Sequence, residues 1–206
     1  MRAPPGEAPG GPYGCGRTGR DGRDEFRRRA RSTFQTSRPP GRTHGRYDEE
    51  KTMQKITPCL WFDGQAQEAA EHYVAIFGGD SRILDTTYYS EAGPGETGSV
   101  LTVDFRLAGQ DYMGLNGGPQ FPFTEAISLS VDCADQAEVD RFWDALSEGG
   151  ETGQCGWLKD RYGVSWQIVP NELPKLLADP DRAKADRTMK AMLGMTKLDI
   201  QALRDA

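Results

Sequence analysis

The chain has 206 residues and a formal net charge of −6 at pH 7, and its charge is divided unevenly. Residues 1–52 contain 12 Lys or Arg and 7 Asp or Glu, a net +5, whereas the remainder contains 13 and 24, a net −11. An acidic body disfavours nucleic acid as a partner, and no hydrophobic run approaches the roughly 20 residues that would span a bilayer. The four cysteines form no CxxC pair, which favours a cytoplasmic protein with free thiols.

Residues 1–52 are rich in Gly, Pro and Arg and contain almost no aliphatic residues. Such a segment cannot bury enough apolar surface to offset its ordering entropy, so we predict that it is disordered. Its GxGxxG sequence at Gly14–Gly19 lacks the preceding strand and the following helix that a dinucleotide site needs. Patterned sequence begins at Met53, and we hypothesise that the residues before it arise from an upstream start of the reading frame.

The first patterned unit predicts one helix among four strands. The helix covers Gln65–Phe77, where Ala69, Ala70 and Tyr73 share one face and two glycines follow the last turn. In the third strand, Val103 and Phe105 alternate with polar residues, as expected for a half-buried strand. The four predicted strands are Lys55–Phe62, Arg82–Tyr89, Ser99–Leu107 and Gln110–Leu115.

The same order of elements then recurs. It predicts a strand over Glu125–Val131, a helix over Asp135–Glu148 and a hairpin over Gly153–Pro170 that turns at Asp160–Gly163. The two helices align at an offset of 69, and the hairpin turns align Met113 with Gln167. Two such units imply an internal duplication, because neither could bury its sheet face alone.

The last segment predicts three short helices, Glu172–Ala178, Pro180–Leu193 and Lys197–Asp205. Met189, Met192 and Leu193 would form an apolar strip that either caps the sheet or meets a second copy of the chain. The predicted organisation is therefore a tail at 1–52, an α+β domain at 53–170 with modules 53–120 and 121–170, and a helical extension at 171–206.

Four stretches resemble one family: Ile56–Gly64, Leu115–Pro119, Phe123–Ser128 and Gln154–Pro170. They are similar to the PhnB-like subfamily of the vicinal-oxygen-chelate superfamily, which includes glyoxalases, bleomycin-resistance proteins and extradiol dioxygenases. The subfamily often carries the label 3-demethylubiquinone-9 3-methyltransferase. The resemblance covers about residues 54–206 and implies two tandem βαβββ modules that form curved mixed sheets. It also implies a homodimer, since such relatives commonly dimerise and exposed sheet edges need covering.

The resemblance implies a divalent metal held by His and Glu, but the matching residues here differ. Where the superfamily pattern Asp-Pro-x-Gly-Asn-x-Ile-Glu-Leu has its ligand Glu, this chain has Gln167, and neither first strand contains a His. We therefore predict no metal and no cofactor. The alternative is a metal-dependent lyase, isomerase or dioxygenase whose ligands include Glu125 and Gln167. Methyl transfer is disfavoured, because the body lacks a Gly-rich loop that closes a strand–helix turn.

The prediction that remains is a sheet-lined pocket for a small organic molecule. Trp157 and Phe123 would supply flat apolar walls, whereas Asn116 and Gln167 would orient the ligand by hydrogen bonds. The alternative for each aromatic residue is an ordinary place in the core, and whether any reaction is catalysed stays open. The candidate ligand-binding residues are Trp61, Asn116, Phe121, Phe123, Trp157, Trp166 and Gln167.

Overall fold

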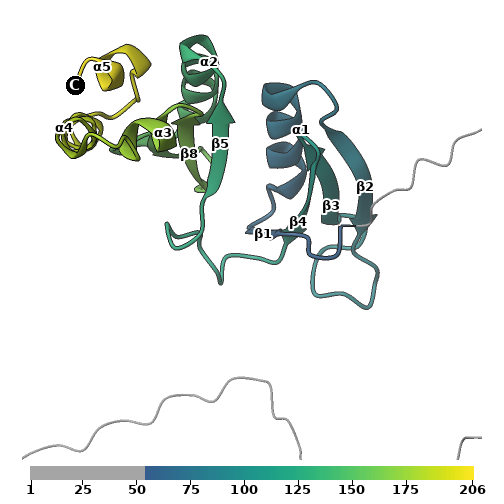
Figure 1. Ribbon diagram of the computed structural model, residues 1–206. Helices are drawn as coiled ribbons and strands as arrows, with labels where there is room; N and C mark the ends of the chain where they lie inside the picture. Colours follow the sequence, from purple (N-terminus) through teal and green to yellow (C-terminus); the bar gives the residue numbers. More distant parts are fainter. Residues whose placement is uncertain (1–53) are drawn as a thin grey trace, which may run out of the picture. The chain divides into compact units, whose positions relative to one another are not determined.

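The computed structural model describes residues 54–206, which belong to the compact unit Glu50–Ala206 (Figure 1). The predicted disordered tail, residues 1–52, lies outside the described residues. Within the part of the chain that is described, no helix combines the length and the apolar character needed to cross a membrane.

The first module forms a four-stranded sheet with one helix against it. The strand order is β1-β4-β3-β2; β1 runs parallel to β4, and the other pairs are antiparallel. On β3 the predicted alternation is confirmed, since Val103, Phe105 and Leu107 are buried and the residues between them are less so. The elements are β1 (Cys59–Phe62), α1 (Ala66–Phe77), β2 (Arg82–Tyr88), β3 (Val100–Leu107) and β4 (Gln110–Asn116).

The second module repeats this topology. Its sheet has the order β5-β8-β7-β6, with the parallel pair β5–β8 in the place of β1–β4. Asp135 begins the helix by accepting a hydrogen bond from the backbone N–H of Glu138 at 2.9 Å. The elements are β5 (Leu129–Cys133), α2 (Gln136–Ser147), β6 (Glu151–Thr152), β7 (Trp157–Lys159) and β8 (Ser165–Pro170). The predicted duplication of a βαβββ unit is confirmed.

Both first strands begin four residues later than predicted. At β1 the reason is visible: the side-chain amide of Gln54 bonds both the N–H and the C=O of Asp111, each at 3.0 Å. These are backbone groups of β4 that a longer first strand would have used. At β5, Glu125 lies in a turn, and its carboxylate contacts Lys159.

The two modules share one core, and α1 provides most of the contact between them. Tyr73 packs its ring 5.3 Å from that of Trp166, and Phe77 packs 4.9 Å from Phe142. The strands β1 and β5 lie at the edges of their own sheets, and neither pairs with the other among residues 54–206. The modules are therefore joined by helix and side-chain packing and not by a continuous sheet.

The C-terminal segment contains α3 (Leu173–Leu177), α4 (Arg182–Leu193) and α5 (Ile200–Arg204), which enclose a second small apolar cluster. Gln136 ties it to the start of α2, because its side chain donates to the Leu198 carbonyl at 3.1 Å and accepts from the Ile200 N–H at 2.9 Å. Of the predicted apolar strip, Met192 packs on this cluster, whereas Met189 and Leu193 are exposed.

Candidate functional site

Each sheet has one face on the helices and an outer face, and the strand register places equivalent residues on the two outer faces. In the first sheet Cys59, Met113, Asp104 and Asp85 lie side by side across the four strands. In the second sheet Ser130, Gln167 and Trp157 form the corresponding row. Met113 and Gln167 thus each pair with the first strand of their own module, in agreement with the predicted alignment.

These rows do not fit the divalent metal that the superfamily implies. They offer a thiol, a thioether, carboxylates, a hydroxyl and an amide, but no imidazole. Burial, with a smaller effect of Asp104, raises the pKa of the Cys59 thiol and so disfavours the ligating thiolate. The Gln167 amide nitrogen donates to Ser128 Oγ at 2.8 Å. Among residues 54–206, no three His, Cys, Asp or Glu side chains converge into a metal-binding group.

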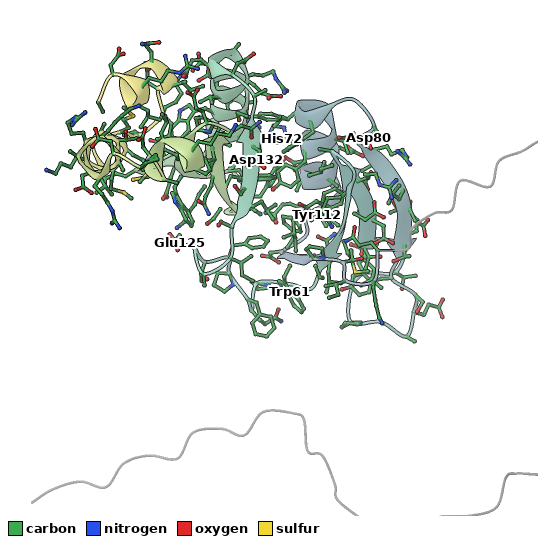
Figure 2. All side chains as sticks on the ribbon, in the orientation of Figure 1. Trp61, His72, Asp80, Tyr112, Glu125 and Asp132 are labelled. Carbon is green, nitrogen blue, oxygen red and sulfur yellow. The ribbon has the colours of Figure 1, made fainter. Side chains whose placement is uncertain are left out.

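A hollow of about 380 Å³, here called the aromatic hollow, opens between the end of β1, the linker after β4 and the β7–β8 turn. Trp61 and Phe62 come from β1, Phe121 and Phe123 from the linker, and Tyr162 from the turn. Trp61 lies beside this linker, and Glu125 belongs to it (Figure 2). The hollow therefore collects five aromatic side chains from three separate stretches of the sequence.

The Leu115–Pro119 motif explains how the hollow is held in place. Asn116 accepts from the Ala66 N–H at 2.9 Å and donates to the Val100 carbonyl at 3.0 Å, which joins the start of α1 to β3. Gly117 lies close against the indole of Trp61, where an added Cβ atom would be 2.1 Å from the ring. The Trp61 N–H then donates to the Gly118 carbonyl at 2.7 Å. These contacts fix both the indole and the start of the linker.

The aromatic rings of the hollow meet edge to face. Trp61 and Phe121 have ring centroids 5.0 Å apart, and Phe62 lies 5.3 Å from Phe123 and 6.5 Å from Tyr162. The Tyr162 hydroxyl donates to Glu68 on α1 at 3.1 Å, which sets the orientation of that ring. Phe121 remains 64% exposed, so an apolar ring faces solvent while it is held against Trp61.

Two charged residues line the aromatic hollow, Asp63 and Lys159. The ammonium of Lys159 lies 2.5 Å from a carboxylate oxygen of Glu125, and this contact raises the pKa of Lys159 and lowers that of Glu125. Asp63 is exposed and has no hydrogen-bond or ion-pair partner within residues 54–206. Lys159 is thus already paired with Glu125, whereas the carboxylate of Asp63 has no such partner within residues 54–206.

The structure brings together only some of the predicted ligand-binding residues. Trp61, Phe121 and Phe123 line the aromatic hollow, whereas Asn116 lines a separate polar hollow of about 480 Å³ and makes internal hydrogen bonds. Trp157 lines a small hollow of about 120 Å³ on the outer face of the second sheet, where Gln167 is its cross-strand neighbour.

Trp166 is only 1% exposed, and its indole N–H donates to Asp160 at 2.7 Å, so its main role is in the core between the modules. The aromatic hollow is also lined by Phe62, Asp63, Lys159 and Tyr162, which the sequence does not predict as ligand-binding residues. The turn at Asp160–Gly163 was the one sequence signal near Tyr162 and Lys159, and it did not indicate which way their side chains point.

Two tandem βαβββ modules, each with an outer sheet face, define a protein of the vicinal-oxygen-chelate fold. A family model described as 3-demethylubiquinone-9 3-methyltransferase matches residues 54–169, so the chain belongs to this PhnB-like family. A crystallised putative 3-demethylubiquinone-9 3-methyltransferase, PhnB protein, from Bacillus cereus is 37% identical. That similarity covers 57% of this chain and 99% of the other, with a TM-score of 0.53.

More distant solved structures carry related names. A glyoxylase/bleomycin resistance protein/dioxygenase domain from Frankia sp. EAN1pec is 16% identical, with 58% of this chain and 93% of the other covered and a TM-score of 0.38. The fosfomycin resistance protein FosX from Listeria monocytogenes is 14% identical, with 55% and 87% covered and a TM-score of 0.37. Comparison with curated proteins finds no match.

Proposed function

We propose that this PhnB-like protein binds a small organic molecule in the aromatic hollow, without a metal ion. The observation that carries the proposal is the convergence of Trp61, Phe121 and Phe123 with Tyr162 around about 380 Å³. A hollow of this size, with aromatic walls and several polar groups, falls in the range of small-molecule sites. A ligand that covers the exposed ring of Phe121 would remove its apolar surface from water and so favour binding.

The two catalytic alternatives have weaker support. A metal-dependent lyase, isomerase or dioxygenase needs a converging ligand set, and the outer faces offer Met113 and Gln167 where charged ligands would be needed. A methyltransferase that uses S-adenosylmethionine commonly has a Gly-rich loop between a strand and a helix. The β1–α1 turn, Asp63–Gln65, contains a single glycine.

We further propose that the protein is a homodimer. Among residues 54–206 the strands β1 and β5 lie at sheet edges, and exposed edges of this kind are usually covered. Light scattering at micromolar concentration is expected to give twice the chain mass, and a single-chain mass would contradict the proposal. A cytoplasmic location and the absence of nucleic-acid and membrane partners remain predictions from the composition.

Ligand-observed NMR with indole and phenol as probes tests the ligand-binding proposal. Both probes are expected to bind the wild type, and Phe121→Ala should weaken binding about tenfold because it removes an aromatic wall. Ile127→Ala is the matched control, since Ile127 is also an exposed apolar residue of the linker, at 77%, but does not line the hollow. Equal binding by wild type and Phe121→Ala would contradict the proposed site.

A further inference from the structure

We propose that the ligand of the aromatic hollow is an organic cation, with its ammonium group held between the aromatic rings and the carboxylate of Asp63. This inference rests on the proposed function and names the class of ligand. It is carried by two independent observations, which are the arrangement of the rings and the distribution of charge around them.

The rings of the hollow are suited to a cation. The face of an aromatic ring carries negative electrostatic potential, and Trp and Tyr attract cations more strongly than they attract neutral groups of the same shape. In the Trp61–Phe121 pair the planes meet at 79°, so the rings are not stacked face to face; Gly117 lies against the Trp61 indole, whereas Phe121 remains 64% exposed. A quaternary methylated ammonium ion could contact the aromatic rings and lose little hydration, because its charge is spread over its methyl groups.

Tyr162 adds to the attraction of the aromatic rings for a cation. Its hydroxyl donates to the Glu68 carboxylate, which shifts electron density toward the ring. Burial, together with this hydrogen bond, raises the pKa of Tyr162 to about 12. The hydrogen bond to Glu68 keeps the Tyr162 ring in one orientation beside the hollow.

The charges around the hollow disfavour an anion. Glu125 neutralises Lys159 at 2.5 Å, and Glu151 lies directly across from Lys159 in the β6–β7 register. An anionic ligand would have to displace Glu125 while Glu151 opposes it, and Asp63 would repel it as well. A cation meets Asp63 with no competing partner within residues 54–206, and the acidic body attracts it from a distance.

Three probes of similar size separate the charge classes: phenyltrimethylammonium, benzyl alcohol and benzenesulfonate. Isothermal titration of the full chain is expected to give an affinity for phenyltrimethylammonium about tenfold above that for benzyl alcohol. Benzenesulfonate should bind most weakly. Measurements at low and high NaCl separate the ring contribution, which persists, from the diffuse attraction of the acidic body, which is screened.

Two variants test the two observations separately. Asp63→Asn is expected to weaken the binding of phenyltrimethylammonium about threefold to tenfold and to leave the affinity for benzyl alcohol unchanged. Asp132→Asn is its matched control, since it removes an exposed carboxylate outside the hollow. Phe121→Leu keeps an apolar side chain but removes the aromatic ring, so it should reduce the affinity for phenyltrimethylammonium more than the affinity for benzyl alcohol.

The outcomes distinguish this inference from the proposed function. If benzyl alcohol binds as well as phenyltrimethylammonium, or if benzenesulfonate binds most tightly, the hollow is still a ligand site but the ligand is not a cation. If Asp63→Asn and Asp132→Asn weaken the cation equally, the attraction is diffuse and the inference fails. If none of the probes binds, both the inference and the proposed site are wrong.

Discussion

Tyr73 on α1 donates its hydroxyl to Asp160 in the β7–β8 turn at 2.7 Å, and this buried hydrogen bond links the two modules. The carboxylate of Asp160 is 3% exposed and also accepts from the Trp166 indole and from the backbone N–H groups of Tyr162 and Val164. Burial, followed by the nearby Asp160, raises the pKa of Tyr73 well above its usual value, so the phenol remains a donor. The residue that joins the modules therefore also shapes the turn that presents Tyr162 to the aromatic hollow.

Asp160→Ala should lower the free energy of unfolding by about 3 kcal/mol or more, because it removes the acceptor of four hydrogen bonds, three of them buried. Tyr73→Phe should cost about 1 kcal/mol, the value of one buried hydrogen bond. Urea denaturation measures both. Asp144→Ala is the control, since its carboxylate is 74% exposed. A similar loss in Asp144→Ala and Asp160→Ala would contradict the central role of Asp160.

Gly117→Ala should destabilise the protein by about 1–3 kcal/mol, because the added methyl group would overlap the Trp61 indole. The indole would have to move, so we also expect a change in tryptophan fluorescence and weaker binding in the aromatic hollow. Gly194→Ala is the matched control, since its added Cβ meets only ordinary van der Waals contacts. Unchanged thermal unfolding and fluorescence in Gly117→Ala would show that the close approach is not restrictive.

We expect the Asp104 carboxyl to lower the free energy of unfolding as the pH rises and this group loses its proton. Burial, followed by Asp85 and Asp111, raises the pKa of its carboxyl, so the folded state binds this proton more tightly than the unfolded state. Its charged form thus opposes folding above the usual carboxyl pKa near 4. Asp104→Asn should therefore raise Tm at pH 7, and the gain should shrink as pH falls through the carboxyl range.

Asp140 provides a control of opposite sign for this pH dependence. Its hydrogen bond to Lys197 lowers the pKa of the Asp140 carboxyl, so its contribution to stability is present at neutral pH and is lost on acidification. Asp140→Asn should lower Tm at pH 7 and converge with wild type in acid. If Asp104→Asn and Asp140→Asn changed Tm at pH 7 in the same direction, the opposite pKa shifts of the two carboxyl groups would be contradicted.

Chelation should leave the protein unaffected. With Gln167 and Met113 at the equivalent positions of the two sheets, the outer faces lack the charge that holds a divalent ion tightly. Protein purified without added metal should contain well under about one equivalent, and EDTA should not change Tm. Gln167→Glu should increase affinity for a divalent ion. Stoichiometric metal in the wild type would instead favour the catalytic alternative.

The repeated architecture was predictable because its determinants are local. The apolar stripes of both helices, the glycines of the hairpin turns and the alternation on β3 each act within a few residues. The motif around Asn116 and Gly117 was also visible in the sequence, and the structure shows why it takes this form: Asn116 anchors the start of α1 and Gly117 makes room for Trp61. The sequence pattern predicts Asn116 as a ligand contact, whereas in the structure its side chain makes internal hydrogen bonds.

Tertiary structure decided which aromatic residues meet. Trp61 and Trp166 both lie on strands and look alike in the sequence, yet Trp61 borders the aromatic hollow and Trp166 is buried between the modules. The decisive contacts join residues far apart in the chain, since Trp61 and Gly118 are separated by 57 in sequence number and Glu68 and Tyr162 by 94. Local pattern specifies which face of a strand a side chain occupies. What covers that face depends on how separate elements pack, because burial and hydrogen bonding are set by groups that only folding brings together.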